Sequence, residues 1–298
     1  MSVVASAAQA PEAVTPRTDT WAQLVLQALG SGRTRVGLGL VGLVVACAVV
    51  GPYVAPHSAT GFQGAPYAAP SPAAPLGTDY LGRDVLSRFL DGGRSVLLLA
   101  LVSTVLGVSG GTVVGLIAGY TLRAADEVLM RTMDLVLAFP SIVLILMLVS
   151  IVGPAIWLIV LIVGVSYTPP TARVIRAATL QVRDLDFIKY AEAIGVPRFR
   201  ILLGEILPNI VAPLTVEFGL RLTYSIGLIA SLDYLGFGVQ PPRPDWGLMI
   251  KENQAGLNVA PWAVLLPVLA VALITIGSNL VTDGFGRAIA GIERRVDA

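Results

Sequence analysis

Only a few side chains in this sequence are placed to do chemistry. Residues 107–111 read Gly-Val-Ser-Gly-Gly, which matches the nucleophile pattern G-x-S-x-G. A serine nucleophile needs a general base within hydrogen-bond reach. The only histidine of the 298 residues is His57, which lies outside the apolar segment that carries Ser109. We therefore expect no catalytic residue, and a protease active at Ser109 is the weaker interpretation.

The glycines around Ser109 have a simpler explanation. Gly107, Gly111, Gly115 and Gly119 recur at every fourth residue. This spacing places them on one face of a helix, and small residues on such a face let two membrane helices approach closely. The stripe predicts a helix-packing surface.

Nucleotide, metal and nucleic-acid chemistry are not supported either. A phosphate-binding loop needs Gly-Lys-Ser or Gly-Lys-Thr, but the only two lysines, Lys189 and Lys251, are followed by Tyr190 and Glu252. One histidine and one cysteine, Cys47, without clustered carboxylates cannot supply an ordinary tetrahedral metal site. The net charge of +1 gives no basic field for nucleic acid. We expect no metal and no cofactor in this chain.

A small set of ionisable residues lies inside apolar segments or at their ends: Asp134, Glu217, Arg221 and Asp233. Glu217 and Arg221 are four residues apart, so they can pair on one helix face. Charges within a membrane are costly and often line a pathway. A structural ion pair between helices explains Glu217 and Arg221 equally well, and a structural role is favoured for Asp134 because it lies near a helix end.

The composition indicates a membrane protein. The chain is 55% hydrophobic and 13% charged, with a mean hydropathy of +0.79, whereas soluble domains carry about 25% charged residues. Apolar segments cover residues 36–56, 95–122, 135–172, 206–232 and 257–282. The third would form a helix of about 57 Å, against a hydrocarbon core of about 30 Å, so it must fold back, and Gly153-Pro154 marks the turn. The sequence predicts an all-α integral membrane protein with six transmembrane helices.

The distribution of basic residues predicts the orientation. Most Lys and Arg fall on one side if both termini are cytoplasmic, which the positive-inside rule favours. We expect residues 1–30 to be a disordered cytoplasmic N-terminus and 31–95 to be the first span with an extracytoplasmic loop. Residues 96–285 would form the core with five spans, and 286–298 a cytoplasmic tail.

Residues 183–208, between the fourth and fifth spans, predict a short cytoplasmic helix at 184–196. Phe187, Tyr190, Ala191 and Ile194 follow at helical spacing as one apolar stripe, and Gly195 is a natural helix stop. A helix this short is marginal alone in water. It therefore predicts either a helix laid in a partner's groove or one lying on lipid.

Several segments resemble known motifs. Ala191, Gly195, Leu207 and Pro208 match the EAA signature of ABC import permeases, while Lys189, Tyr190 and Glu205 depart from it. Three further segments resemble LGTDxLGRDVLSR, MRxxDxxLAFP and LGLGVQPPxPxWG of dipeptide and oligopeptide permeases, at residues 76–88, 130–140 and 235–247. Asp233 and Tyr234 stand where Ser and Phe are more usual. The chain is identified as a C-type permease of the peptide/nickel ABC importer family.

The resemblance implies a MetI-like helical bundle in the bacterial plasma (inner) membrane. It also implies a homologous B-type permease partner, two cytoplasmic ATPase subunits that bind ATP and Mg, and an extracytoplasmic substrate-binding protein. The short cytoplasmic helix would couple to the ATPases through Phe187, Tyr190, Ala191, Ile194, Gly195, Leu207 and Pro208. The expected cargo is a di- or oligopeptide, with glutathione and nickel chelates as alternatives.

An alternative of another class is an ion-coupled secondary transporter. Glu217, Arg221 and Asp233 would then form the relay, and no ATPase would be needed.

Overall fold

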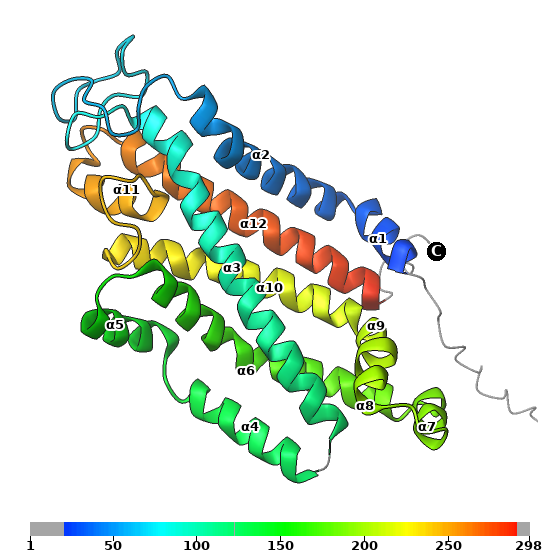
Figure 1. Ribbon diagram of the computed structural model, residues 1–298. Helices are drawn as coiled ribbons and strands as arrows, with labels where there is room; N and C mark the ends of the chain where they lie inside the picture. Colours follow the sequence, from blue (N-terminus) through cyan, green and yellow to red (C-terminus); the bar gives the residue numbers. More distant parts are fainter. Residues whose placement is uncertain (1–20, 122, 291–298) are drawn as a thin grey trace, which may run out of the picture.

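The fold is a bundle of long helices (Figure 1). The computed structural model describes residues 21–121 and 123–290, and no strand occurs among them. The helices run α1 (Trp21–Gly30), α2 (Gly32–Val54), α3 (Val85–Tyr120), α4 (Arg123–Leu137), α5 (Ser141–Val152), α6 (Ile156–Arg183), α7 (Asp186–Ala193), α8 (Arg198–Arg200), a π-helix at Ile201–Ile206, α9 (Leu207–Asn209), α10 (Val211–Leu235), α11 (Trp246–Asn253), a 3₁₀ turn at Gln254–Gly256, and α12 (Trp262–Ala290). The predicted all-α class is confirmed.

Four helices, α2, α3, α6 and α12, are long and apolar enough to cross a membrane. The number rises to six within the described residues if each of two bent helix pairs counts as one span. The predicted turn at Gly153 is present, since this residue ends α5 with a φ of +97°, a conformation that favours glycine. The six predicted segments are therefore all found, but two of them are not straight helices.

Prolines explain the two bends. The third candidate span is the bent pair α4 and α5, and residues 123–134 of α4 lie before the predicted apolar segment 135–172. The two helices meet at 73°, where Pro140 follows α4 and disfavours helix in the residue before it. The fifth candidate span is also bent, by 72°, between the helical stretch at Arg198–Asn209 and α10. There Pro208 and Pro213 lack the N–H that a continuous helix needs.

Two element boundaries in the structure differ from those predicted. Residues 21–30, expected to be disordered, form α1, while residues 1–20 and 291–298 lie outside the described part. The second span starts at Val85 rather than near residue 95, because its charged first turns are neutralised by partners from the outer loop and α11.

The central packing joins α3 to α6, and the glycine stripe lies in this contact. A Cβ at Gly107, Gly111, Gly115 or Gly119 would come within 2.5–2.7 Å of an α6 atom, much closer than real Cβ contacts. Gly164 of α6 has the same role on the opposite helix, since a Cβ at this position would clash with the Leu106 side chain of α3. The two backbones are therefore as close as glycine permits.

Replacing Gly111 with Leu should destabilise the bundle, because overfilled packing costs about 1–3 kcal/mol or more. We expect a lower yield of monodisperse protein and a lower melting temperature in detergent. Gly39→Leu is the matched control, since nothing lies within 4 Å of a Cβ there, and Ser109→Ala, on an exposed part of the same helix, should also be silent. Equal behaviour of Gly111→Leu and Gly39→Leu would refute the packing role.

Candidate functional site

The predicted short helix is α7, eight residues long, in the connection between α6 and α10. Its end is a Schellman motif: the Gly195 N–H donates to the Glu192 carbonyl at 3.0 Å, and the Val196 N–H donates to the Ala191 carbonyl at 3.0 Å. Gly195 has a φ of +79°. This backbone geometry explains why a glycine ends the helix here, independently of any partner.

The apolar residues of α7 divide between two faces. Ile188 is fully buried, and Ala191 is half-buried against the same core cluster. Phe187, Tyr190 and Ile194 are 42%, 68% and 61% exposed. The spacing predicted one stripe of Phe187, Tyr190, Ala191 and Ile194, but Ala191 packs with the core cluster, because it follows Ile188 by three residues and lies near the same helix face. We call Phe187, Tyr190 and Ile194 the exposed trio.

The inward face fixes α7 to the long helices. Ile188 lies in one core cluster with Leu116 of α3 and Ile175 of α6. Residues Ile201, Ile206 and Ile210, which follow α7 along the chain, are buried in the same cluster. Leu207 packs against it, whereas Pro208 is exposed. The inward face of α7 therefore packs into one cluster with residues of both α3 and α6.

Glu217 and Arg221 form the expected pair within α10. The Arg221 Nε donates to Glu217 Oε1 at 2.6 Å, and the Thr171 hydroxyl of α6 donates to the same oxygen at 3.1 Å. The Arg221 guanidinium also lies over the rings of Tyr167 and Tyr224, with its central carbon 5.9 and 5.7 Å from their centroids. The pair is thus bonded to α6 through Thr171, and its cation lies against two tyrosine rings.

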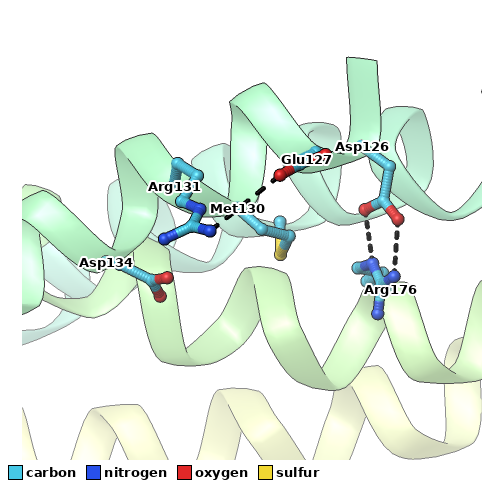
Figure 2. A pocket seen from close by; sticks show the side chains of 6 residues that line it. All are labelled: Asp126, Glu127, Met130, Arg131, Asp134 and Arg176. Atoms are coloured by element: carbon cyan, nitrogen blue, oxygen red, sulfur yellow. Dashed lines mark hydrogen bonds and ion pairs between the residues drawn. The ribbon is translucent and has the colours of Figure 1, made fainter. Parts of the chain in front are cut away.

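Asp134 belongs to a separate charged surface between α4 and α6. It accepts a hydrogen bond of 2.5 Å from Arg173, both side chains being about half exposed. Figure 2 shows the neighbouring pocket, where Arg176 of α6 binds both carboxylate oxygens of Asp126 on α4. These contacts attach the bent third span to α6, which supports a structural role for Asp134.

Asp233 lies apart from the other charges. It is fully buried at the outer end of α10, where it accepts the Val239 N–H at 2.7 Å, and it adjoins a second buried carboxyl, Asp245. Asp245 caps α11 and accepts from the Ser95 hydroxyl at 2.5 Å. Burial raises the pKa of the Asp245 carboxyl. The structure therefore does not bring Asp233 together with Glu217 and Arg221.

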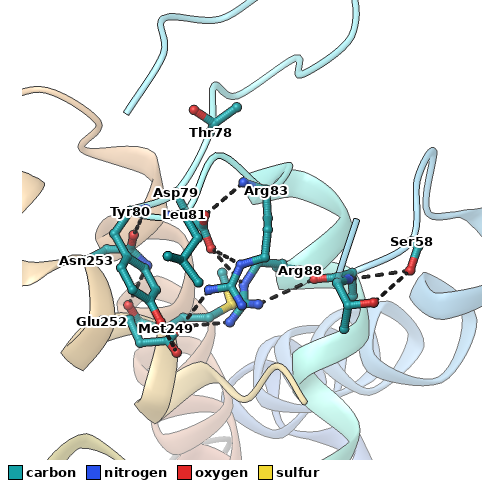
Figure 3. Close-up of polar contacts among 12 residues, drawn as sticks. Ser58, Thr78, Asp79, Tyr80, Leu81, Arg83, Arg88, Met249, Glu252 and Asn253 are labelled. Atoms are coloured by element: carbon teal, nitrogen blue, oxygen red, sulfur yellow. Dashed lines mark hydrogen bonds and ion pairs between the residues drawn. The ribbon is translucent and has the colours of Figure 1, made fainter. Parts of the chain in front are cut away.

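A buried ion network at the outer end was not recognised from the sequence (Figure 3). The carboxylate of Asp79 contacts Arg83 at 2.7 Å and Arg88 at 3.2 Å. Glu252 of α11 closes the network, 3.2 Å from Arg83 and 2.8 Å from Arg88. Tyr80 donates its hydroxyl to Glu252 at 3.0 Å, and its pKa is raised mainly by burial and then by the charge of Glu252.

This network joins the outer loop, α3 and α11, so a large part of the LGTDxLGRDVLSR-like motif has a structural explanation. The signal in the sequence was the presence of two arginines, Arg83 and Arg88, shortly after Asp79 and around the start of α3. Their acidic partner Glu252 is more than 160 residues away, beyond the reach of local patterns. Among the described residues, no group of three or more His, Cys, Asp or Glu side chains could hold a metal ion.

Comparison with known proteins gives a consistent result. Residues 111–294 match the family "Binding-protein-dependent transport system inner membrane component". The glutathione transport system permease protein GsiD of Pectobacterium atrosepticum is 36% identical over 92% of this chain and 91% of that protein. The di/tripeptide transport system permease protein DppC of Pseudomonas aeruginosa is 36% identical over 85% of this chain and 86% of that protein.

A third relative, the dipeptide transport system permease protein DppC of Alkalihalophilus pseudofirmus, is 36% identical over 72% of this chain and 70% of that protein. The family match at residues 111–294 includes α4 to α12. These similarities give no support to an ion-coupled secondary transporter. The chain belongs to the family of binding-protein-dependent transport system inner membrane components, as a multi-pass permease of the C-type in the peptide branch of ABC importers.

Proposed function

We propose that this chain forms half of the translocation path of an ATP-driven importer of di- or oligopeptides. The observation that carries the proposal is its similarity to permeases of glutathione and di/tripeptide systems over 85–92% of its length. Glutathione and nickel chelates are the other cargo classes to test. Stimulation of ATPase activity by each ligand class, in the complex reconstituted with its binding protein, is the direct test.

The partners in this proposal are a homologous B-type permease, two ATPase subunits that hold ATP and Mg, and an extracytoplasmic binding protein. Support for the ATPase contact comes from the exposed trio. Three large apolar side chains point away from the bundle, on a helix whose opposite face is anchored in the core. A short amphipathic helix presented in this way suits insertion into a groove on a partner. ATP hydrolysis would then take place in the partner subunits, and this chain would have no catalytic residue.

The proposed orientation places both termini in the cytoplasm. In Figure 1, α1, the end of α12 and α7 lie at one end of the bundle, and the loop between α2 and α3 lies with α11 at the other. The excess of basic residues on the α7 side agrees with this orientation. The binding protein would then dock on the outer loop and α11, which the buried ion network joins into one unit.

Cysteine labelling tests the orientation. In a Cys47→Ala background, Ser71→Cys should react with an impermeant maleimide in intact cells, because residue 71 is exposed in the outer loop. Gln181→Cys, exposed near the end of α6, should react only after permeabilisation. Labelling of residue 181 from outside would reverse the orientation and remove the ATPase contact from the proposal.

A double substitution tests the coupling role of α7. Phe187→Ser with Tyr190→Ser removes two apolar side chains, each worth roughly 1.5–3 kcal/mol when buried by a partner, so ATPase binding should weaken by about a hundredfold or more. The readouts are co-purification of ATPase subunits and ATP-dependent uptake in the same membranes.

The matched control is Asp186→Ser with Lys189→Ser on the same helix. These two exposed residues pair with each other at 3.5 Å and lie outside the trio, and exposed ion pairs contribute little. We expect the control to retain ATPase binding and uptake. If the Phe187/Tyr190 variant behaves like the control, α7 is not the coupling element.

A further inference from the structure

Arg221, an ionisable residue within the membrane-spanning part, makes hydrogen bonds with only some of its donor groups. Arg221 lies near the middle of α10, where a charge is costly unless it has a partner or faces water. Its Nε is occupied by Glu217. The two terminal nitrogens of its guanidinium donate to no hydrogen-bond partner among the residues described. The side chain of Glu217 is 4% exposed and that of Arg221 is 16% exposed, so the cation is the member of the pair that reaches an open surface.

The open surface continues along α10 toward its outer end. Tyr224 is 57% exposed. Ser231, two helical turns beyond Tyr224 on the same face, is exposed too, but its hydroxyl donates to the Gly227 carbonyl at 2.7 Å and it lies in a groove lined mostly by apolar side chains. Polar hydroxyls in the span of a membrane helix suit a water-filled path or a protein contact better than lipid. Arg221 and the exposed Tyr224 are therefore the polar groups at this position of α10, where the surface is open within this subunit.

The geometry around Arg221 holds it in one orientation. Glu217 fixes the Nε side, Thr171 of α6 fixes Glu217, and the rings of Tyr167 and Tyr224 lie within 6 Å of the guanidinium. Such a planar fork, restrained at one edge and free at the other, matches a carboxylate, which arginine can bind through two parallel hydrogen bonds. The nearby carboxylate of Glu217 repels a second anion, so the Arg221 guanidinium is unsuited to binding an anion tightly and permanently.

We propose that Arg221 transiently binds the free C-terminal carboxylate of the peptide as it passes, and so acts as a selectivity residue of the path. The inference rests on the proposed peptide-import function and deepens it. Transport requires a contact favourable enough for entry and weak enough for release. The negative charge of Glu217 makes release possible, because it partly cancels the positive charge of Arg221 and so weakens the attraction of the cargo carboxylate.

The test compares a peptide with a free C-terminus and the same peptide with a C-terminal amide. Uptake is measured in proteoliposomes containing the complete complex, with one saturating preparation of the binding protein throughout. Because the binding protein is the same in every assay, a change in the acid-to-amide uptake ratio between permease variants must come from the permease. Loss of one charge-assisted contact should change this ratio by about tenfold.

Three variants keep the result interpretable. Arg221→Gln paired with Glu217→Gln removes both charges and leaves no unpaired buried carboxylate. Arg221→Lys keeps the charge but not the planar fork, so it should lower the ratio less. Arg173→Gln is the matched control, since Arg173 lies on α6 near its cytoplasmic end and pairs with Asp134 away from this face.

We expect the double variant to narrow the acid-to-amide ratio by about tenfold, Arg221→Lys to give an intermediate ratio, and Arg173→Gln to keep the wild-type ratio. Equal slowing of both peptides with an unchanged ratio would overturn the proposal and make the pair purely structural. If Arg221 instead binds an acidic side chain of the second permease, both peptides should also slow equally and the acid-to-amide ratio should stay unchanged. If the wild-type complex shows no ATP-dependent peptide uptake at all, the proposed function fails instead, and the two failures are thus distinguishable.

Discussion

The close approach of α3 and α6 is the constraint on which the rest of this structure depends. Four glycines one turn apart on α3 leave no room for a Cβ, because the α6 backbone and side chains occupy that space. In lipid the hydrophobic effect does little to hold two helices together, so packing and polar contacts must do so. A long contact of this kind makes α6 a fixed element, and the helices that touch α6 take their positions from it.

Polar contacts complete the assembly where the chain cannot rely on apolar packing. The outer end is closed by Asp79, Arg83, Arg88 and Glu252 with almost no exposure to water. Removing one partner from such a network would leave an uncompensated buried charge, which costs several kcal/mol, about 3–5. The inner end is attached through exposed pairs such as Asp134 with Arg173. These exposed pairs are individually weak, so the buried cluster that includes Ile175 and Ile188 contributes more to packing at this end.

Local patterns in the sequence were enough to predict the helices but not the contacts between distant parts. Length and hydropathy predicted the six segments, and Gly153-Pro154 predicted the turn between α5 and α6. The bend at Pro140 was not predicted, because composition alone does not tell a straight span from a broken one. Spacing predicted one apolar stripe that included Ala191, but Ala191 packs with the buried Ile188 while Phe187, Tyr190 and Ile194 are exposed. Glu252 could not be assigned to Arg88 because no local rule joins residues so far apart.

The same reasoning connects the two ends of the proposed mechanism. Tyr167, Thr171 and Ile175 are four residues apart in turn, so they lie along one face of α6. Ile175 packs in the cluster that holds Ile188 of α7, Thr171 contacts Glu217, and Tyr167 lies against Arg221. Pro169 and Pro170 lie between Tyr167 and Thr171 and remove two backbone N–H donors within α6. The connection from α7 to Arg221 therefore runs through this row of side-chain contacts rather than through an uninterrupted helix. In the proposed mechanism, ATP-driven movement at α7 would reach Arg221 along this row of contacts, since packed contacts change between discrete arrangements rather than continuously.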